Sequence, residues 1–308
     1  MANLTTLGKV LEKVQRMSEA HTDRYVEVGD ISFDNIETVK ISGESFQMKL
    51  TAQQAIANRL GIPIHYLRKC PPDMQRHNMN FWIEQEKNQR LFFRFDKNEV
   101  RAVFTPRYIP TDNLEVLERL LGLGYELNTP VQVSLDDDFM MVNVPDGDKI
   151  FSVNGDRMTP GISISNSEVG IAALSISAFV LRLVCTNGMV ARTEVAASYR
   201  HVSAKILEEF PHVLDNVGRE LAKQRDQLRI SLESRVEKVE ATITSFNQRF
   251  LLSKEEKEAV DWAMPLEYGQ TMFNIINIYT KAAQFRELSA DSSYRLQKVG
   301  GMILGLVK

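Results

Sequence analysis

Apolar and polar residues alternate most regularly in the middle of the chain, between residues 161 and 202. From Leu174 to Val180 apolar residues recur at every second position, which is the pattern of a strand with one buried face. Arg182 has the same parity as these residues. Because an unpaired buried charge is strongly destabilising, we expect Arg182 to be buried and paired with a carboxylate such as Glu168 or Glu194.

Shorter segments of the first 200 residues show the same alternation, bounded by Gly, Asn and Asp turn signals. They predict a β-meander over residues 25–50 and hairpins over residues 90–105 and 125–143. Segments with helical spacing lie between and before these strands, at residues 3–17, 52–60, 73–87 and 114–121.

Residues 52–67 form two short helical segments around Gly61, an arrangement that resembles a helix-turn-helix. Pro71 and Pro72 end the second segment early and leave little room for a recognition helix. We therefore interpret these residues as a structural helical corner.

After Val202 the apolar residues follow a spacing of three and four, which predicts helices. The pattern is continuous from His212 to Phe250 and predicts one long helix there, followed by a helix that begins with a capping box of Ser253 and Glu256. The sequence thus predicts an α+β fold with an antiparallel sheet core and short helices. Its predicted domains are an α+β core over 1–201 and a helical, coiled-coil-like region over 202–308, with the terminal helices forming a homo-oligomer.

The chain has 308 residues, of which 44% are hydrophobic and 25% are charged, as expected for a globular protein. It lacks an apolar run long enough to span a membrane, and its N-terminal segment is charged, so we expect a cytoplasmic protein without a membrane partner. The net charge is −3, but residues 51–110 carry ten Lys or Arg and five Asp or Glu, whereas residues 111–160 carry three and ten. This asymmetry favours either binding of a polyanion to the basic side of the protein or self-association between oppositely charged faces.

The basic excess is concentrated around the hairpin at residues 90–105. Guanidinium groups beside an aromatic ring are the side chains that bind the backbone and stack on the bases of a single strand. We therefore predict a nucleic-acid-binding site, with an exposed sheet face whose arginines are balanced by acids as the alternative. Its residues are Arg90, Arg94, Arg101, Arg107 and Tyr108.

Motifs for nucleotide binding, zinc proteolysis, thiol redox chemistry and serine hydrolysis are absent from the sequence, which makes an enzyme the less favoured class. We assign no catalytic residue, metal or cofactor. Asp136, Asp137 and Asp138 are adjacent, and we interpret them as an exposed turn because alternate residues of a strand point to opposite faces. The polar residues 163–168 are likewise interpreted as a turn.

Three stretches resemble the phage- and plasmid-borne family known as domain of unknown function 932. They are LGIP at 60–63 leading to Tyr66 and Leu67, VRAVFTPRY at 100–108, and ISNSE at 164–168 together with RLVCTNGM at 182–189. The resemblance implies an α+β core, a long-helical tail and a mobile-element setting. It implies no catalytic residue.

Two hypotheses follow for the function. The first is a non-enzymatic protein that binds single-stranded nucleic acid, as an annealing accessory in DNA recombination or replication. The second is a protein-interaction or virion structural component that binds no nucleic acid. Salt-dependent retention of single-stranded DNA would distinguish them.

Overall fold

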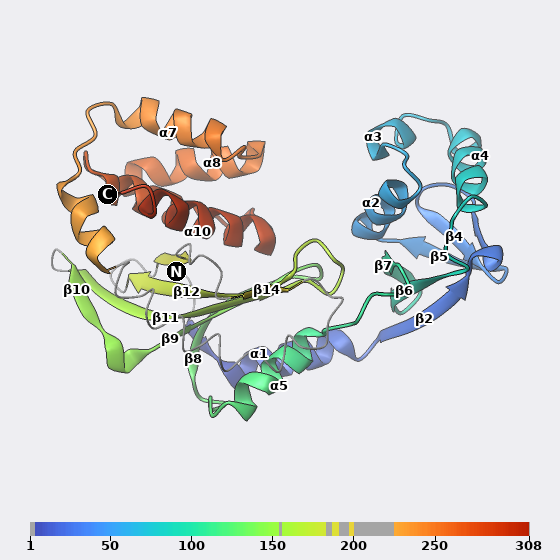
Figure 1. Ribbon diagram of the computed structural model, residues 1–308, viewed down its shortest axis with the longest axis horizontal. Helices are drawn as coiled ribbons and strands as arrows, with labels where there is room; N and C mark the ends of the chain where they lie inside the picture. The colour runs from blue at the N-terminus through green and yellow to red at the C-terminus, as the bar shows by residue number, and fades with distance from the viewer. Residues whose placement is uncertain (1–3, 154–155, 183–186, 191–196, 200–224, 308) are drawn as a thin grey trace.

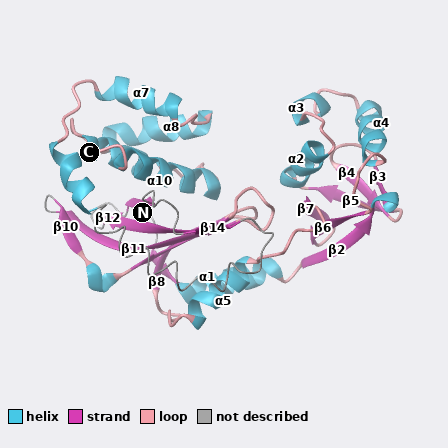
Figure 2. Ribbon diagram, in the orientation of Figure 1, coloured by secondary structure: helices cyan, strands magenta, loops and turns pink. Residues whose placement is uncertain are grey.

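The computed structural model describes residues 4–153, 156–182, 187–190, 197–199 and 225–307, and these form two β-sheets with helices packed on them (Figures 1 and 2). The α+β class predicted from the sequence is confirmed. The predicted domain boundary at residue 201 lies outside the described residues.

The first sheet, here the N-terminal sheet, has the order β2-β6-β7-β5-β4-β3. Its pairs are antiparallel except for β5 and β7, which are parallel. The strands are β2 (His21–Glu27), β3 (Ile31–Phe33), β4 (Thr38–Ile41), β5 (Glu44–Met48), β6 (Arg90–Asp96) and β7 (Glu99–Phe104).

Three helices cover one face of the N-terminal sheet: α2 (Leu50–Arg59), α3 (Ile64–Leu67) and α4 (Pro72–Ile83) (Figure 1). Val26, Leu91 and Phe93 from the strands join Ile56 and Met79 from the helices in one buried cluster. A 3₁₀ turn, η1 (Val28–Asp30), connects β2 to β3. The helical corner predicted around Gly61 is present, and α3 is only four residues long.

The second sheet, here the central sheet, has the order β1-β8-β9-β11-β12-β13 among the described residues, with β10 on β11 and β14 on β12. The alternation from Leu174 to Val180 becomes strand β12, and β11 pairs with it. The strands are β1 (Leu4–Thr6), β8 (Pro130–Leu135), β9 (Met140–Pro145), β10 (Phe151–Val153), β11 (Asp156–Asn166), β12 (Leu174–Arg182), β13 (Asn187–Val190) and β14 (Ala197–Tyr199), with the 3₁₀ turn η2 (Gly147–Lys149) before β10.

Helices lie on both faces of the central sheet (Figure 1). α1 (Leu7–Ser18) and α5 (Asn113–Gly122) bury Val10 and Leu117 against Val142 and Ile164. The C-terminal helices cover the other face, where Phe179 and Leu181 join Ala290 and Tyr294 of the last helix in a buried cluster. They are α7 (Val239–Arg249), α8 (Lys254–Ala263), α9 (Met272–Ala282) and α10 (Ala290–Leu304), with the 3₁₀ turn η4 (Met264–Leu266) after α8.

The prediction of one long helix from His212 to Phe250 is wrong. Residues 225–233 are helical, but the helix ends there and α7 begins only at Val239. The backbone between the two helices makes hydrogen bonds to the segment that leads into α9 instead of helical ones. The Val236 N–H donates to Gln270 O at 2.8 Å, and Ser234 O accepts from the Met272 N–H at 2.9 Å. The apolar residues of this stretch pack inside the helical layer instead of forming an extended coiled-coil seam. The Ser253–Glu256 capping box at the start of α8 is confirmed.

Gly161 provides a test of the register between β9 and β11. It pairs with Pro145, and a Cβ at this position would overlap the carbonyl oxygen of Val144. We expect Gly161→Ala to lower the free energy of unfolding by about 1–3 kcal/mol, because the neighbouring backbone cannot yield easily. Gly29→Ala is the control, since no heavy atom lies within 4 Å of that Cβ. Equal urea midpoints for the two variants would contradict this register.

Candidate functional site at the junction of the two sheets

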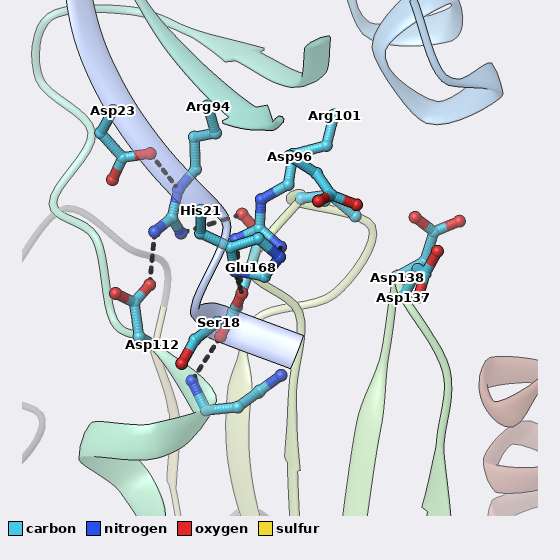
Figure 3. Close-up of polar contacts among 12 residues, drawn as sticks. Ser18, His21, Asp23, Arg94, Asp96, Arg101, Asp112, Asp137, Asp138 and Glu168 are labelled. Atoms are coloured by element: carbon cyan, nitrogen blue, oxygen red, sulfur yellow. Dashed lines mark hydrogen bonds and ion pairs between the residues drawn. The ribbon is translucent and has the colours of Figure 1, made fainter. Parts of the chain in front are cut away.

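Two of the four predicted arginines, Arg94 and Arg101, converge where the N-terminal sheet meets the turn after β11 and the start of α5 (Figure 3). Arg94 comes from β6 and Arg101 from β7, and the carboxylate between them is Glu168 from the turn between β11 and β12. We call the charged residues gathered here the junction network. It contains Asp23, Arg94, Arg101, Asp112 and Glu168.

Arg94 connects three segments of the chain. The residue is 1% exposed, and its side chain donates from Nε to Asp23 Oδ1 (3.0 Å), from Nη2 to Asp112 Oδ1 (2.5 Å) and from Nη1 to the Glu168 carbonyl oxygen (3.2 Å). Burial alone would lower the pKa of Arg94, but the charges of Asp112 and Asp23 outweigh it and raise the pKa. The guanidinium group is therefore charged and held inside the protein.

Arg101 reaches the same place because β7 carries a bulge. Arg94 pairs with Ala102 and Phe95 pairs with Val100, so Arg101 is the extra residue, and a bulge re-aims its side chain. Arg101 is 3% exposed and donates from Nη2 to Glu168 Oε2 at 2.5 Å.

Glu168 is the residue that most of the junction contacts share. Its Oε1 accepts the N–H of Asn113 at 2.7 Å. Since Asn113 is the first residue of α5, the carboxylate also interacts favourably with the positive end of the helix dipole. Burial would raise the pKa of Glu168, but the charge of Arg101 and the Asn113 hydrogen bond lower it on balance. The carboxylate is therefore ionised at neutral pH.

His21 lies against this ion pair. Its Nε2 is 3.3 Å from Arg101 Nη1, and its Nδ1 is 3.8 Å from Glu168 Oε2. Since a guanidinium group only donates, Nε2 accepts and the ring proton of the neutral form belongs on Nδ1. Burial and the charge of Arg101 lower the pKa of His21 from its ordinary value of 6.5, although Glu168 and Asp96 oppose this.

A pocket of about 300 Å³ opens beside the junction network, lined by the end of α1 and by residues from several other segments. Its charged lining is balanced: Arg16, Lys49, Lys97 and Arg101 face it together with Glu19, Asp96, Asp137 and Glu168. Lys49 is bound to Asp96 at 2.8 Å and to Asp137 at 3.2 Å. Among the described residues, no group of three or more His, Cys, Asp or Glu side chains is arranged to hold a metal ion.

The structure thus places the five predicted site residues in two environments. Arg94, Arg101 and Tyr108 are 1%, 3% and 8% exposed, so the expectation that they lie on an open surface is wrong. Tyr108 stacks on Phe104 with ring centroids 3.7 Å apart and donates to Glu168 O at 3.3 Å, and burial raises its pKa to about 12. Arg90 and Arg107 are exposed.

An exposed ring accompanies Arg90. The guanidinium carbon of Arg90 lies 4.6 Å from the ring centroid of Tyr25, which is 50% exposed. The ring centroids of Tyr25 and Phe92 are 5.1 Å apart, and those of Phe92 and Tyr108 are 5.7 Å apart. A row of rings therefore runs from the junction network to the exposed surface. We call Tyr25 and Arg90, together with the exposed Arg107 in the turn after β7, the sheet surface.

Local sequence patterns do not reveal Tyr25, His21, Asp23 or Asp112 as site residues, because each reaches the site through a long-range pairing. The polar residues 163–168 are only in part a turn: Asn166 ends β11 and donates to Thr111 O at 2.9 Å, whereas the Ser167 hydroxyl accepts backbone N–H groups of the turn. Arg182 ends β12, and its side chain lies outside the described residues. Glu168, one of its two predicted partners, is bound by Arg101.

The turn predicted at residues 136–138 is present as the connection between β8 and β9, but only Asp137 is exposed, whereas Asp136 and Asp138 are half-buried. Asp136 Oδ1 accepts the N–H groups of Asp138 and Phe139, at 3.0 and 2.9 Å. Its other oxygen accepts the N–H of Ala290 at the start of α10, at 2.8 Å. This turn therefore holds neighbouring elements together.

Comparison with known proteins identifies the family. The family model described as Domain of unknown function (DUF932) matches residues 101–302, which is more than half of the chain. The chain therefore belongs to the DUF932 family. No curated protein and no solved structure matches it. Among the described residues, no helix has the length and apolar character needed to cross a membrane.

The junction network predicts a definite response of stability to pH. The folded-state pKa of His21 lies below 6.5, so the unfolded chain takes up a proton first as the pH falls, and folding loses free energy from about pH 6.5 downward. Glu168, whose folded pKa lies below its ordinary value of 4.5, adds a second loss at more acidic pH, with the same sign.

Urea unfolding of the wild type and of His21→Gln between pH 8 and pH 5 measures the first loss, with His77→Gln as the exposed control. We expect the stability difference between wild type and His21→Gln to shrink or reverse as the pH falls. A difference that stays constant across this range would contradict the environment described for His21.

Proposed function

We propose that this DUF932 protein is a non-enzymatic single-stranded nucleic-acid-binding protein, acting in the host cytoplasm as an annealing accessory in the recombination or replication of a phage or plasmid. The observation that carries the proposal is the sheet surface, where Arg90 covers the half-exposed ring of Tyr25. An aromatic face beside a guanidinium group binds a base by stacking and the adjoining phosphate by charge.

The sheet surface is held in place before any strand binds. The Tyr25 ring packs beside Phe92, its partner on the neighbouring strand, and Phe92 packs against the buried Tyr108. Arg107 immediately precedes Tyr108 in the chain. Side chains that are already ordered lose little entropy on binding. In this proposal Arg94 and Arg101 are positioning residues, because their guanidinium groups bind Asp23, Asp112 and Glu168.

Binding by one subunit is expected to be weak, since the chain has a net charge of −3 and the sheet surface has two exposed arginines. The proposal therefore includes a homo-oligomer through the C-terminal helices, so that several subunits act on one strand. Support comes from the apolar side chains that this helical layer exposes: Leu251 is 80%, Leu266 50% and Tyr268 83% exposed.

The sheet surface is tested by measuring the affinity for a labelled oligothymidine, from its fluorescence anisotropy, at several salt concentrations. Arg90→Ala with Arg107→Ala should weaken binding and reduce the log–log salt slope by about 0.7 for each lost phosphate contact. Tyr25→Ala should cost about 1–3 kcal/mol of binding free energy through lost stacking.

Arg249→Ala is the matched control, because it also removes an exposed cation that lies over a ring, that of Phe250 at 5.8 Å, but in α7. It should leave affinity and slope unchanged. If the Arg90/Arg107 double variant binds with wild-type affinity and slope, the sheet surface is not the site. If no single strand binds to the wild type, the protein-interaction or virion alternative replaces the proposal.

A further inference from the structure

A second group of exposed aromatic and cationic side chains lies on α3, α4 and the residues between them. Four large apolar side chains are exposed there: Tyr66 (46%), Met74 (46%), Phe81 (51%) and Trp82 (47%). Residues 74, 81 and 82 recur at helical spacing on the outer side of α4. The Tyr66 hydroxyl contacts Met74 Sδ at 3.8 Å, and the Phe81 and Trp82 rings meet edge to face at 5.3 Å.

Cations accompany these rings. Arg68, Lys69 and Arg76 are exposed, and so are two histidines, His65 and His77. Residues 64–82 contain one acid, Asp73, which binds Arg76 at 3.1 Å. Exposed rings surrounded by an excess of positive charge are typical of a surface that binds a polyanion with stackable bases. They are less typical of a protein–protein interface, whose core is usually depleted in charged residues. We call Tyr66, Arg68, Lys69, Phe81 and Trp82 the corner surface.

The rings of the corner surface are not needed to hold α4 in place, because polar residues on its inner side do so. The Asn80 side chain both donates to and accepts from the backbone of Phe33, at 2.9 and 2.7 Å. The Gln75 amide donates to Leu67 O and Cys70 O at 3.0 Å, and its oxygen accepts the Ile36 N–H at 3.0 Å. A rigid helix therefore presents the rings outward.

The corner surface and the sheet surface lie on opposite faces of the N-terminal sheet. Val26 and Leu91 are buried with the residues of α2 and α4, whereas the adjacent Tyr25 and Phe92 point to the other face, since successive strand residues alternate. Figure 1 shows α2, α3 and α4 together on one side of β6 and β7. One contact with a straight segment of nucleic acid cannot cover both surfaces.

We infer that the corner surface is a second binding site for single-stranded nucleic acid, so that one subunit holds two strands. This inference rests on the proposed function, and it supplies what an annealing accessory requires, which is the simultaneous capture of two strands. The four-residue α3 gives the corner no recognition helix for duplex DNA, so the site reads backbone charge and exposed bases.

Tryptophan fluorescence tests the corner surface separately from the sheet surface. The chain has two tryptophans, Trp82 and Trp262, so Trp262→Phe leaves Trp82 as the sole reporter. Oligothymidine should quench Trp82, and it should still do so when Tyr25, Arg90 and Arg107 are replaced by alanine. In that triple variant, Trp82→Ala should lower the affinity measured by anisotropy by about 5- to 150-fold.

Each outcome separates the two proposals. Binding by anisotropy without any change in Trp82 emission overturns the corner surface and leaves the sheet surface standing, whereas absence of binding by both signals overturns the proposed function itself. A Trp82 emission shift that depends on protein concentration and not on oligothymidine assigns the corner surface to contacts between copies, which also overturns the inference.

Strand bridging shows whether two strands are held together, and comparison with a corner-surface variant shows whether this surface supplies the second site. Two non-complementary oligothymidine and oligocytidine strands, labelled as an energy-transfer pair, should give transfer in the presence of wild-type protein. Arg68→Ala with Lys69→Ala should abolish the transfer while binding of one strand persists, and the α7 variant Arg249→Ala should not affect it. Equal transfer in the Arg68/Lys69 variant would contradict two-strand capture through this surface.

Discussion

The ionised carboxylate of Glu168, inside the protein at the junction of the two sheets, is the constraint on which the arrangement depends. Burying a charge is costly, and it is tolerated here because Glu168 binds Arg101 and the Asn113 N–H, while its carbonyl oxygen binds Arg94. Arg94 in turn requires Asp23 and Asp112. The contacts come from both sheets and from α5, so the junction network forms only when all of these elements are in place.

This arrangement divides the basic residues of the N-terminal sheet by role. Arg94 and Arg101 use their donors within the protein and thereby position β6 and β7, the strands that carry Arg90 and precede Arg107. The side chains left for a ligand are those that the fold exposes on its two faces, around Tyr25 and around Trp82. The proposed capture of two strands therefore depends on a rigid sheet whose rigidity comes from the junction network.

Local patterns predicted the local features of the fold. Alternation indicated β12 and the β6–β7 hairpin, and the capping box indicated the start of α8, because these depend on neighbouring residues. The long helix failed because residues 234–236 bind residues 270–272, which no local spacing reveals. The burial of Arg94 and Arg101 is not predictable from local spacing, because it depends on the bulge in β7 and on carboxylates that are distant in the sequence. A single Arg within the apolar run LFFRF is nevertheless a local sign of a buried charge.

The central claim is that Arg101 and Glu168 stabilise the fold by binding each other, and a double-mutant cycle tests it most directly. Arg101→Met keeps a long side chain but removes its charge and donors, and Glu168→Gln keeps the acceptor for the Asn113 N–H. Each single variant should lower the free energy of unfolding by about 3–5 kcal/mol, since it leaves a buried polar partner unpaired. The double variant should be much less destabilised than the sum of the two. Additive losses in urea unfolding would show that the two side chains do not depend on each other, and would contradict this account.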